Sequence, residues 1–226
     1  MGLPTVAMGA LGLVMHPVQA AALLVVPSLV TNVWQFVTGP AAASVVRRLA
    51  SMLILVCAGT ALGIPFLTSG GSRWPSVALG LVLAVYAVFG LFLPRLSVPT
   101  RSEPLLSPLV GGLTGVLTGA TGVFVVPAVP YLSALGLSKD ELIQALGLSF
   151  TVSTVALAVA LGASHSYSGT MLWMSLAAVV PALAGMFVGQ TTRSRIEPAA
   201  FRRWFFIAMF LVGTYMTVKG LVAHGF

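Results

Sequence analysis

Residues 111–127, with the sequence GGLTGVLTGATGVFVVP, decide how the chain is arranged. They lie inside an apolar stretch, Leu105–Leu137, whose 33 residues would extend about 50 Å as one helix, against about 30 Å for a bilayer core. Five glycines and two later prolines favour a break around Gly119–Gly122. The two half-helices either cross once or turn back as a re-entrant hairpin. Non-helical backbone at that depth is tolerated only where protein buries it or where it lines a cavity.

The composition indicates an integral membrane protein. Of the 226 residues, 58% are hydrophobic and only 7% are charged, and the mean hydropathy is +1.05. A soluble domain carries roughly 25% charged residues. So few charges exclude a cytosolic enzyme, a disordered protein and a conventional nucleic-acid-binding protein, although the formal net charge is +7.

Six stretches are long and apolar enough to span a bilayer, which takes about 20 residues. Trp74, Trp173 and Trp204 lie near the starts of three of them, where interfacial aromatic residues are expected. The predicted spans are Val18–Val37, Leu49–Leu67, Trp74–Leu93, Leu142–Leu161, Thr170–Gln190 and Ala199–Val222.

The positions of the basic residues favour the hairpin. If the broken segment crossed once, the 11 Lys and Arg residues would divide five against six between the two sides. If it turns back, nine collect on one side and only Arg73 and Lys219 lie on the other. Basic residues accumulate on the cytoplasmic side of membrane proteins. We therefore expect a multi-pass protein of the plasma (inner) membrane whose basic loops are cytoplasmic. The nine are Arg47, Arg48, Arg95, Arg101, Lys139, Arg193, Arg195, Arg202 and Arg203.

The two halves of the chain resemble each other. At a constant offset of 121 residues, Ser28 matches Ser149 and Asn32 matches Ser153. The pair Gly59-xxx-Gly63 matches Gly185-xxx-Gly189 at an offset of 126. A hairpin followed by three spans makes an odd number of crossings, so two such units are inverted relative to each other. Inverted repeats with broken helices are a transporter design.

The predicted fold class is therefore an all-α polytopic membrane protein with two inverted repeats, each a broken or re-entrant helical hairpin followed by three transmembrane helices. Repeat one takes residues 1–97, a connector takes 98–108 and repeat two takes 109–226. Because Met1–Thr5 aligns opposite Gly122–Val126, repeat one has no counterpart of Leu105–Thr121. We expect repeat one to be N-terminally incomplete, with the chain beginning in the middle of its first hairpin.

Ionisable side chains are scarce in the predicted spans. The carboxylates Glu103, Asp140, Glu141 and Glu197 all lie in predicted loops, which disfavours paired-carboxylate catalysis and a proton relay. The three histidines are too dispersed for a metal site. We expect no metal and no cofactor.

The glycine pattern Gly111-xxx-Gly115-xxx-Gly119-Ala120-Thr121-Gly122-xxxx-Pro127 is followed by Leu146-Gly147-Leu148-Ser149. Together they resemble the sulfite exporter TauE/SafE family of membrane transporters, and Gly185-xxx-Gly189 is similar to that family's closing motif. The chain departs from the family where consecutive glycines are usual, and in lacking the first half-hairpin. The resemblance implies a secondary carrier that exports or takes up sulfite, organosulfonates and related small anions.

An anion at mid-membrane would need donors other than buried cations, because no Lys or Arg lies deep within a predicted span. A broken helix offers its N-terminal N–H groups. The half-helix Val123–Leu135 is expected to start after the break, with Pro4 onward as its counterpart. Hydroxyl and amide side chains would complete the site. The candidate substrate-binding residues are Thr5, Ser28, Asn32, Gln35, Gly119, Thr121, Gly122, Ser149 and Ser153.

Each candidate has a structural alternative. Ser and Thr in membrane helices often bond back to the preceding turn, and glycines permit close packing. A passive anion channel and a non-transporting membrane assembly protein are the alternative functions, because nothing in the sequence specifies a coupling ion. An intramembrane hydrolase is disfavoured, because the sequence contains no GxSxG motif, which carries the nucleophilic serine of many hydrolases. The expected partners are a small anionic substrate, the lipid bilayer and an unspecified coupling ion, with no nucleic acid; the oligomeric state stays open.

Overall fold

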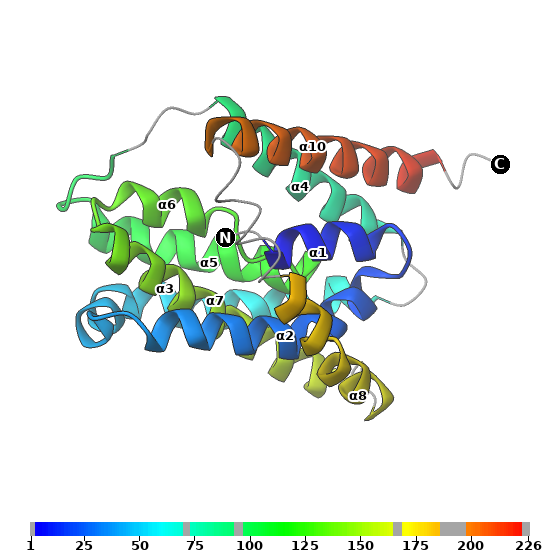
Figure 1. Ribbon diagram of the computed structural model, residues 1–226, viewed down its shortest axis with the longest axis horizontal. Helices are drawn as coiled ribbons and strands as arrows, with labels where there is room; N and C mark the ends of the chain where they lie inside the picture. Colours follow the sequence, from blue (N-terminus) through cyan, green and yellow to red (C-terminus); the bar gives the residue numbers. More distant parts are fainter. Residues whose placement is uncertain (1–2, 70–72, 93–96, 165–168, 186–197, 223–226) are drawn as a thin grey trace.

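The computed structural model consists of helices and loops over the residues that it describes, which are 3–69, 73–92, 97–164, 169–185 and 198–222. The bundle is elongated, with helices lying along its long axis (Figure 1). The helices are α1 Leu3–Gly12, α2 Pro17–Val37, α3 Ala42–Leu67, α4 Trp74–Phe92, α5 Glu103–Thr121, α6 Ala128–Ala134, α7 Lys139–Ala163, α8 Gly169–Ala177 and α10 Pro198–Val222.

Among the described residues, five helices are long and apolar enough to cross a membrane: α2, α3, α4, α7 and the Arg202–Val222 part of α10. They correspond to five of the six predicted spans. The sixth, Thr170–Gln190, contains the shorter apolar helical stretch Gly169–Gly185, and residues 186–190 lie outside the described residues. The all-α polytopic fold is thus confirmed.

Helices α5 and α6 form the predicted re-entrant hairpin. They lie side by side (Figure 1), and the hydroxyls of Ser107 and Tyr131 share a hydrogen bond between them. The chain enters and leaves this hairpin at the same end, because the Val98 N–H donates to the Ala134 carbonyl at 2.9 Å. The broken segment therefore turns back instead of crossing once.

The returning half-helix is shorter than predicted. It begins at Ala128 and has 7 residues, whereas the sequence predicted a start at Val123. Pro127 explains the difference, because a proline disfavours helical backbone at the residue before it. The β-branched Val123, Val125 and Val126 add to this preference for non-helical backbone. The start of α6 is thereby set by Pro127.

Arg48 of α3 fastens the open end of the hairpin. Its guanidinium donates to both Glu103 oxygens, at 2.7 and 2.8 Å, and also to the Leu135 carbonyl at 3.2 Å. These contacts join α3 to the first residue of α5 and to the residue after α6. The expectation that Glu103 lies in a loop is therefore wrong: it begins α5 inside the predicted connector, and it is buried because Arg48 neutralises it.

Helices α3 and α5 pack backbone against backbone. A Cβ atom on Gly111, Gly115 or Gly119 of α5 would overlap the carbonyl oxygen of Met52, Val56 or Thr60, respectively. On the α3 side, a Cβ atom on Gly59 or Gly63 would overlap the carbonyl of Gly112 or Val116. Such close approach allows Cα–H···O contacts and dense van der Waals packing, which associate helices in lipid.

The helix pairs match what inverted repeats would produce. Helix α2 packs on α7, and α4 packs on α10, each pairing one helix with its counterpart from the other half. Figure 1 shows α4 and α10 side by side. Helices α3 and α8 are also counterparts in the two halves. Helix α3 contacts α7, and α8 makes the equivalent contact with α2. The repeats and their boundaries stay a prediction, which this packing favours.

The glycine interface predicts unequal effects of two neighbouring substitutions in α5. Alanine normally stabilises a helix relative to glycine by up to about 1 kcal/mol. Gly112→Ala meets nothing within 4 Å and is expected to leave the melting temperature in detergent unchanged or higher. Gly115→Ala would overlap the α3 backbone, and we expect a loss of about 1–3 kcal/mol. Equal melting temperatures for the two variants would contradict the backbone contact.

The hairpin also predicts which side of the membrane each loop faces. In a Cys57→Ala background, Arg101→Cys before α5 and Lys139→Cys after α6 should react with a membrane-impermeant maleimide from the same side. Arg73→Cys, beyond the far end of α3, should react only from the opposite side. Labelling of positions 101 and 139 from opposite sides would show a single crossing instead.

Candidate functional site

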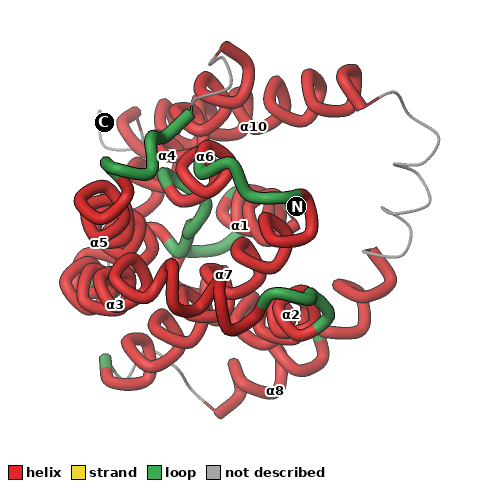
Figure 2. Tube along the Cα trace, turned by 90° about the vertical axis from the view of Figure 1, so that its left-hand side faces the viewer, coloured by secondary structure: helices red, strands yellow, loops and turns green. Residues whose placement is uncertain are grey.

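The break in the hairpin lies in the middle of the bundle. Helix α5 ends at Thr121, and Gly122 adopts a left-handed backbone with φ of 75°, which suits glycine. The chain then continues as the interior loop seen between α5 and α1 in Figure 2. The Thr121 hydroxyl donates to the Leu117 carbonyl at 2.7 Å and accepts the Val123 N–H at 3.3 Å. Thr121 therefore stabilises the turn with its hydroxyl.

The loop after the break carries unpaired backbone donors. The carbonyls of Val125 and Pro127 accept hydrogen bonds from Val129 and Tyr131 of the returning helix. Within the described part of the chain, the N–H groups of Phe124 and Val125 make no hydrogen bond, although both residues are buried. Buried N–H groups without a partner are rare in native proteins. These two can donate to a ligand or a water molecule.

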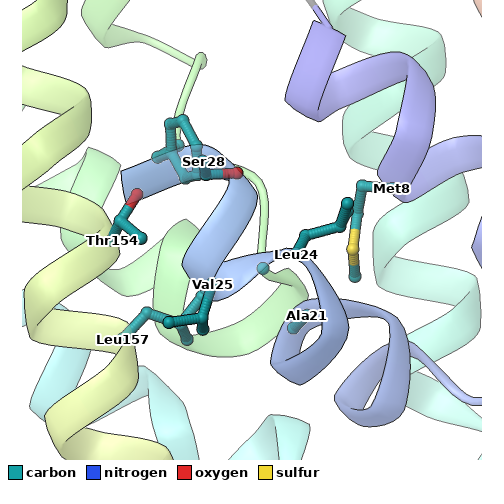
Figure 3. Close-up of a pocket in the computed structure, with 9 residues that line it drawn as sticks. Met8, Ala21, Leu24, Val25, Ser28, Thr154 and Leu157 are labelled. Carbon is teal, nitrogen blue, oxygen red and sulfur yellow. The ribbon is translucent and has the colours of Figure 1, made fainter. Parts of the chain in front are cut away.

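A small cavity lies against this loop, between α1, α2 and α7 (Figure 3). The space open to the centre of a water molecule is about 10 Å³, which is about the room that one water needs. The Ser28 hydroxyl makes no hydrogen bond within the described residues, whereas the Thr154 hydroxyl donates to Phe150 O at 2.7 Å. The lining residues are Met8, Ala21, Leu24, Val25, Ser28, Gly122, Phe124, Thr154 and Leu157.

Helices α2 and α7 run antiparallel beside this cavity. Ser28 and Thr154 line it together. About two turns further along α2, a Cβ atom on Gly147 would lie 2.8 Å from the Phe36 nitrogen. Ser149 and Ser153 lie on α7 between these two contacts, and Asn32 lies between them on α2. The serines and the asparagine therefore belong to the stretch over which α2 packs on α7.

Three of these side chains have no hydrogen-bond partner. The Asn32 Nδ2 atom and the Ser149 and Ser153 hydroxyls are buried and unpaired among the described residues. Each unpaired buried polar group costs about 1–3 kcal/mol of stability. Such groups are few in native proteins, and each calls for an explanation beyond folding. A ligand that accepts their hydrogen bonds would supply that explanation.

The structure does not bring every predicted residue to this place. Thr5 is buried on α1, one turn before the cavity-lining Met8. Gly119 packs on the α3 backbone, and Gln35 is half-buried with its Cβ close to Gly147 of α7. Two of the nine predicted residues line the cavity, and three more carry buried, unpaired polar atoms on α2 and α7 among the described residues. These five are Ser28, Asn32, Gly122, Ser149 and Ser153.

Thr114 was missed by the sequence analysis. Its buried hydroxyl is also unpaired among the described residues. With Ser107, Thr118 and Thr121 it follows helical spacing on one face of α5, next to the glycine face. That spacing is visible in the sequence and could have identified this residue.

Gln144 was also missed, and its role depends on distant partners. Its Nε2 atom donates to the carbonyls of Phe36 at 2.8 Å and Gly39 at 2.9 Å, and its Oε1 atom accepts the Ala41 N–H at 2.7 Å. Gln144 thereby holds the α2–α3 turn against α7.

Ser175 of α8 compensates for the proline in α2. Pro27 has no N–H to donate to Leu23 O, the acceptor four residues earlier. The Ser175 hydroxyl donates to that carbonyl at 2.9 Å and accepts the Val26 N–H at 3.1 Å. Neighbouring serines commonly satisfy backbone groups freed by a proline in a membrane helix. This contact fixes α2 directly before Ser28.

These features define the class of the protein: a polytopic helical membrane protein with a re-entrant hairpin that breaks at a buried polar site. Such broken helices in a membrane bundle are typical of transporters. The family model for sulfite exporter TauE/SafE matches residues 1–216, so the chain belongs to that family. The family consists of membrane transporters of sulfite and related sulfur anions, not of enzymes. Comparisons with curated proteins and with solved structures gave no match.

Paired and unpaired polar residues predict opposite effects on stability. Ser149→Ala removes an unpaired hydroxyl and is expected to leave the melting temperature of the purified protein unchanged or raise it. Gln144→Ala removes three buried hydrogen bonds and leaves backbone groups unpaired, for an expected loss of about 2–4 kcal/mol. If Ser149→Ala were as destabilising as Gln144→Ala, the Ser149 hydroxyl would have a structural partner.

Proposed function

We propose that this protein is a secondary carrier for small sulfur oxyanions, sulfite or an organosulfonate, in the plasma (inner) membrane. Its basic loops and helix ends, with Arg48 near the start of α3 and Arg101 before α5, would face the cytoplasm. The single observation that carries the proposal is the group of buried donors on Asn32, Ser149 and Ser153, unpaired among the described residues, on the two helices that line the cavity beside the break of the hairpin. Family membership supports the class of substrate.

Neutral donors suit an anion that must enter and leave. An oxyanion accepts hydrogen bonds from the Asn32 amide, from the two serine hydroxyls and from the Phe124 N–H. A hydrogen bond to a charged group contributes about 1.5–3 kcal/mol. Several such bonds stabilise the dehydrated anion, but they bind it less tightly than a fixed cation would. Binding would thus be strong enough for capture and weak enough for release.

The small cavity supports a carrier over an open channel. Its room for about one water molecule leaves no place for a sulfonate without a movement of the surrounding helices. In transporters with inverted repeats, access alternates through movement of one part of the bundle against the other. A carrier that must rearrange shows saturation and counterflow, whereas an open pore shows neither.

Uptake into proteoliposomes tests this proposal. Sulfite uptake should saturate, and the Ser149→Ala and Asn32→Ala variants should lose about 10–100-fold in transport efficiency, the equivalent of one hydrogen bond to a charged group. Thr151→Ala is the matched control on α7, because that hydroxyl donates to Gly147 O at 2.7 Å and lies on the α3 side of the helix.

Parental transport in both site variants would refute the site. Uptake that does not saturate, together with single-channel currents, would refute the carrier mechanism and favour a channel. Reconstituted protein that transports no anion would favour the assembly function.

A further inference from the structure

We propose that this site accepts anions with a single negative charge and rejects dianions, so that sulfite passes in its singly protonated form. The inference rests on the proposed function and adds the charge state of the substrate. It follows from which charges surround the unpaired donors and from how the cost of burying an ion grows with its charge.

The described part of the chain places no cation in the interior. The buried polar side chains between the helices are Ser, Thr, Asn and Gln, with Glu103 as the one buried charged residue among those described. Glu103 already has its partner in Arg48. The described basic side chains all lie at the surface or near it. They are His16, Arg47, Arg48, Arg73, Arg101, Lys139, Arg202, Arg203 and Lys219.

The hairpin itself adds a negative partial charge at the cavity. Helix α5 has 19 residues and ends at Thr121, and its C-cap Gly122 lines the cavity. The C-terminal end of a helix carries about half a negative elementary charge. Helix α6 offsets it only weakly, because it has 7 residues and prolines occupy two of its first four N–H positions, Pro127 and Pro130. The Phe124 and Val125 N–H groups compensate this field in part.

The charge of the anion that the site accepts depends on two free energies: the cost of removing the anion from water and its attraction to the donors. The cost of moving an ion out of water grows with the square of its charge, so it is about four times larger for a dianion than for a monoanion of similar size. The attraction of fixed neutral donors grows only in proportion to the charge. A site with three or four such donors, and with no cation among the described residues, therefore favours a single charge.

A singly protonated oxyanion also fits the chemistry of the hydroxyls. Its own O–H group needs an acceptor, and the serine hydroxyls at positions 28, 149 and 153 can each accept as well as donate. A site of backbone N–H groups or cations alone would offer no such acceptor. The hydroxyl lining is therefore compatible both with a protonated oxyanion and with a sulfonate.

The test compares three anions in proteoliposomes of one lipid composition at pH 6 and pH 8. Methanesulfonate is a monoanion at both values, sulfate is a dianion at both, and sulfite changes from mainly monoanion to mainly dianion. We expect equal methanesulfonate uptake at the two pH values and sulfate uptake at the level of empty liposomes. Subsaturating sulfite uptake should fall several-fold at pH 8, by the factor by which its monoanion fraction falls.

Methanesulfonate separates the charge of the substrate from effects of pH on the protein. If its uptake changed with pH by the same factor as that of sulfite, a titrating group or proton coupling would explain the pH dependence and the proposal would fail. It would also fail if sulfate were carried as fast as methanesulfonate, or if sulfite uptake rose at pH 8. Failure of the proposed function looks different: no anion is taken up, or uptake of all three persists unchanged in Ser149→Ala.

Discussion

The close contact of the α3 and α5 backbones determines where everything else in the hairpin lies. In a bilayer, lipid tails are as apolar as leucine, so helices gain little from burying leucines against each other. Glycine lets two backbones approach until carbonyls meet Cα atoms, and dispersion and Cα–H···O contacts then replace the hydrophobic effect. Gly111, Gly115 and Gly119 fix α5 on α3 in this way, in one register.

That register sets the position of the polar site. Because the glycines of α5 occupy the face on α3, the neighbouring face with Thr114, Thr118 and Thr121 is directed into the bundle. It also sets the depth at which α5 ends, and with it the left-handed Gly122 and the unpaired donors after it. A one-residue shift of α5 would place side chains between the two backbones, so the position of the break follows from the glycine spacing.

The sequence predicted the features that depend on length, spacing and charge. The hairpin followed from a stretch too long for one crossing and from the distribution of Lys and Arg. The repeat singled out Ser28, Asn32, Ser149 and Ser153, which the fold buries on α2 and α7. Glu103 was misassigned to a loop because its partner, Arg48, is 55 residues away. Gln144 and Ser175 escaped notice for the same reason, since side chains that bond to distant backbone leave no local pattern.

Gly119 and Thr121 illustrate a different limit, because they belong to the predicted motif yet serve its architecture. Gly119 contacts α3, and the Thr121 hydroxyl closes the turn. A motif in a broken helix must encode both the break and the site, and residue types alone do not separate these roles.

Whether a polar side chain has a hydrogen-bond partner does separate the two roles. The satisfied side chains of Gln144 and Ser175 hold the C-terminal end of α2 and its proline bend, whereas the unsatisfied ones are buried on α2, α5 and α7. The hydrogen bonds of other buried residues therefore offset the free-energy cost of the unpaired donors. This arrangement is expected of a site kept ready for a ligand.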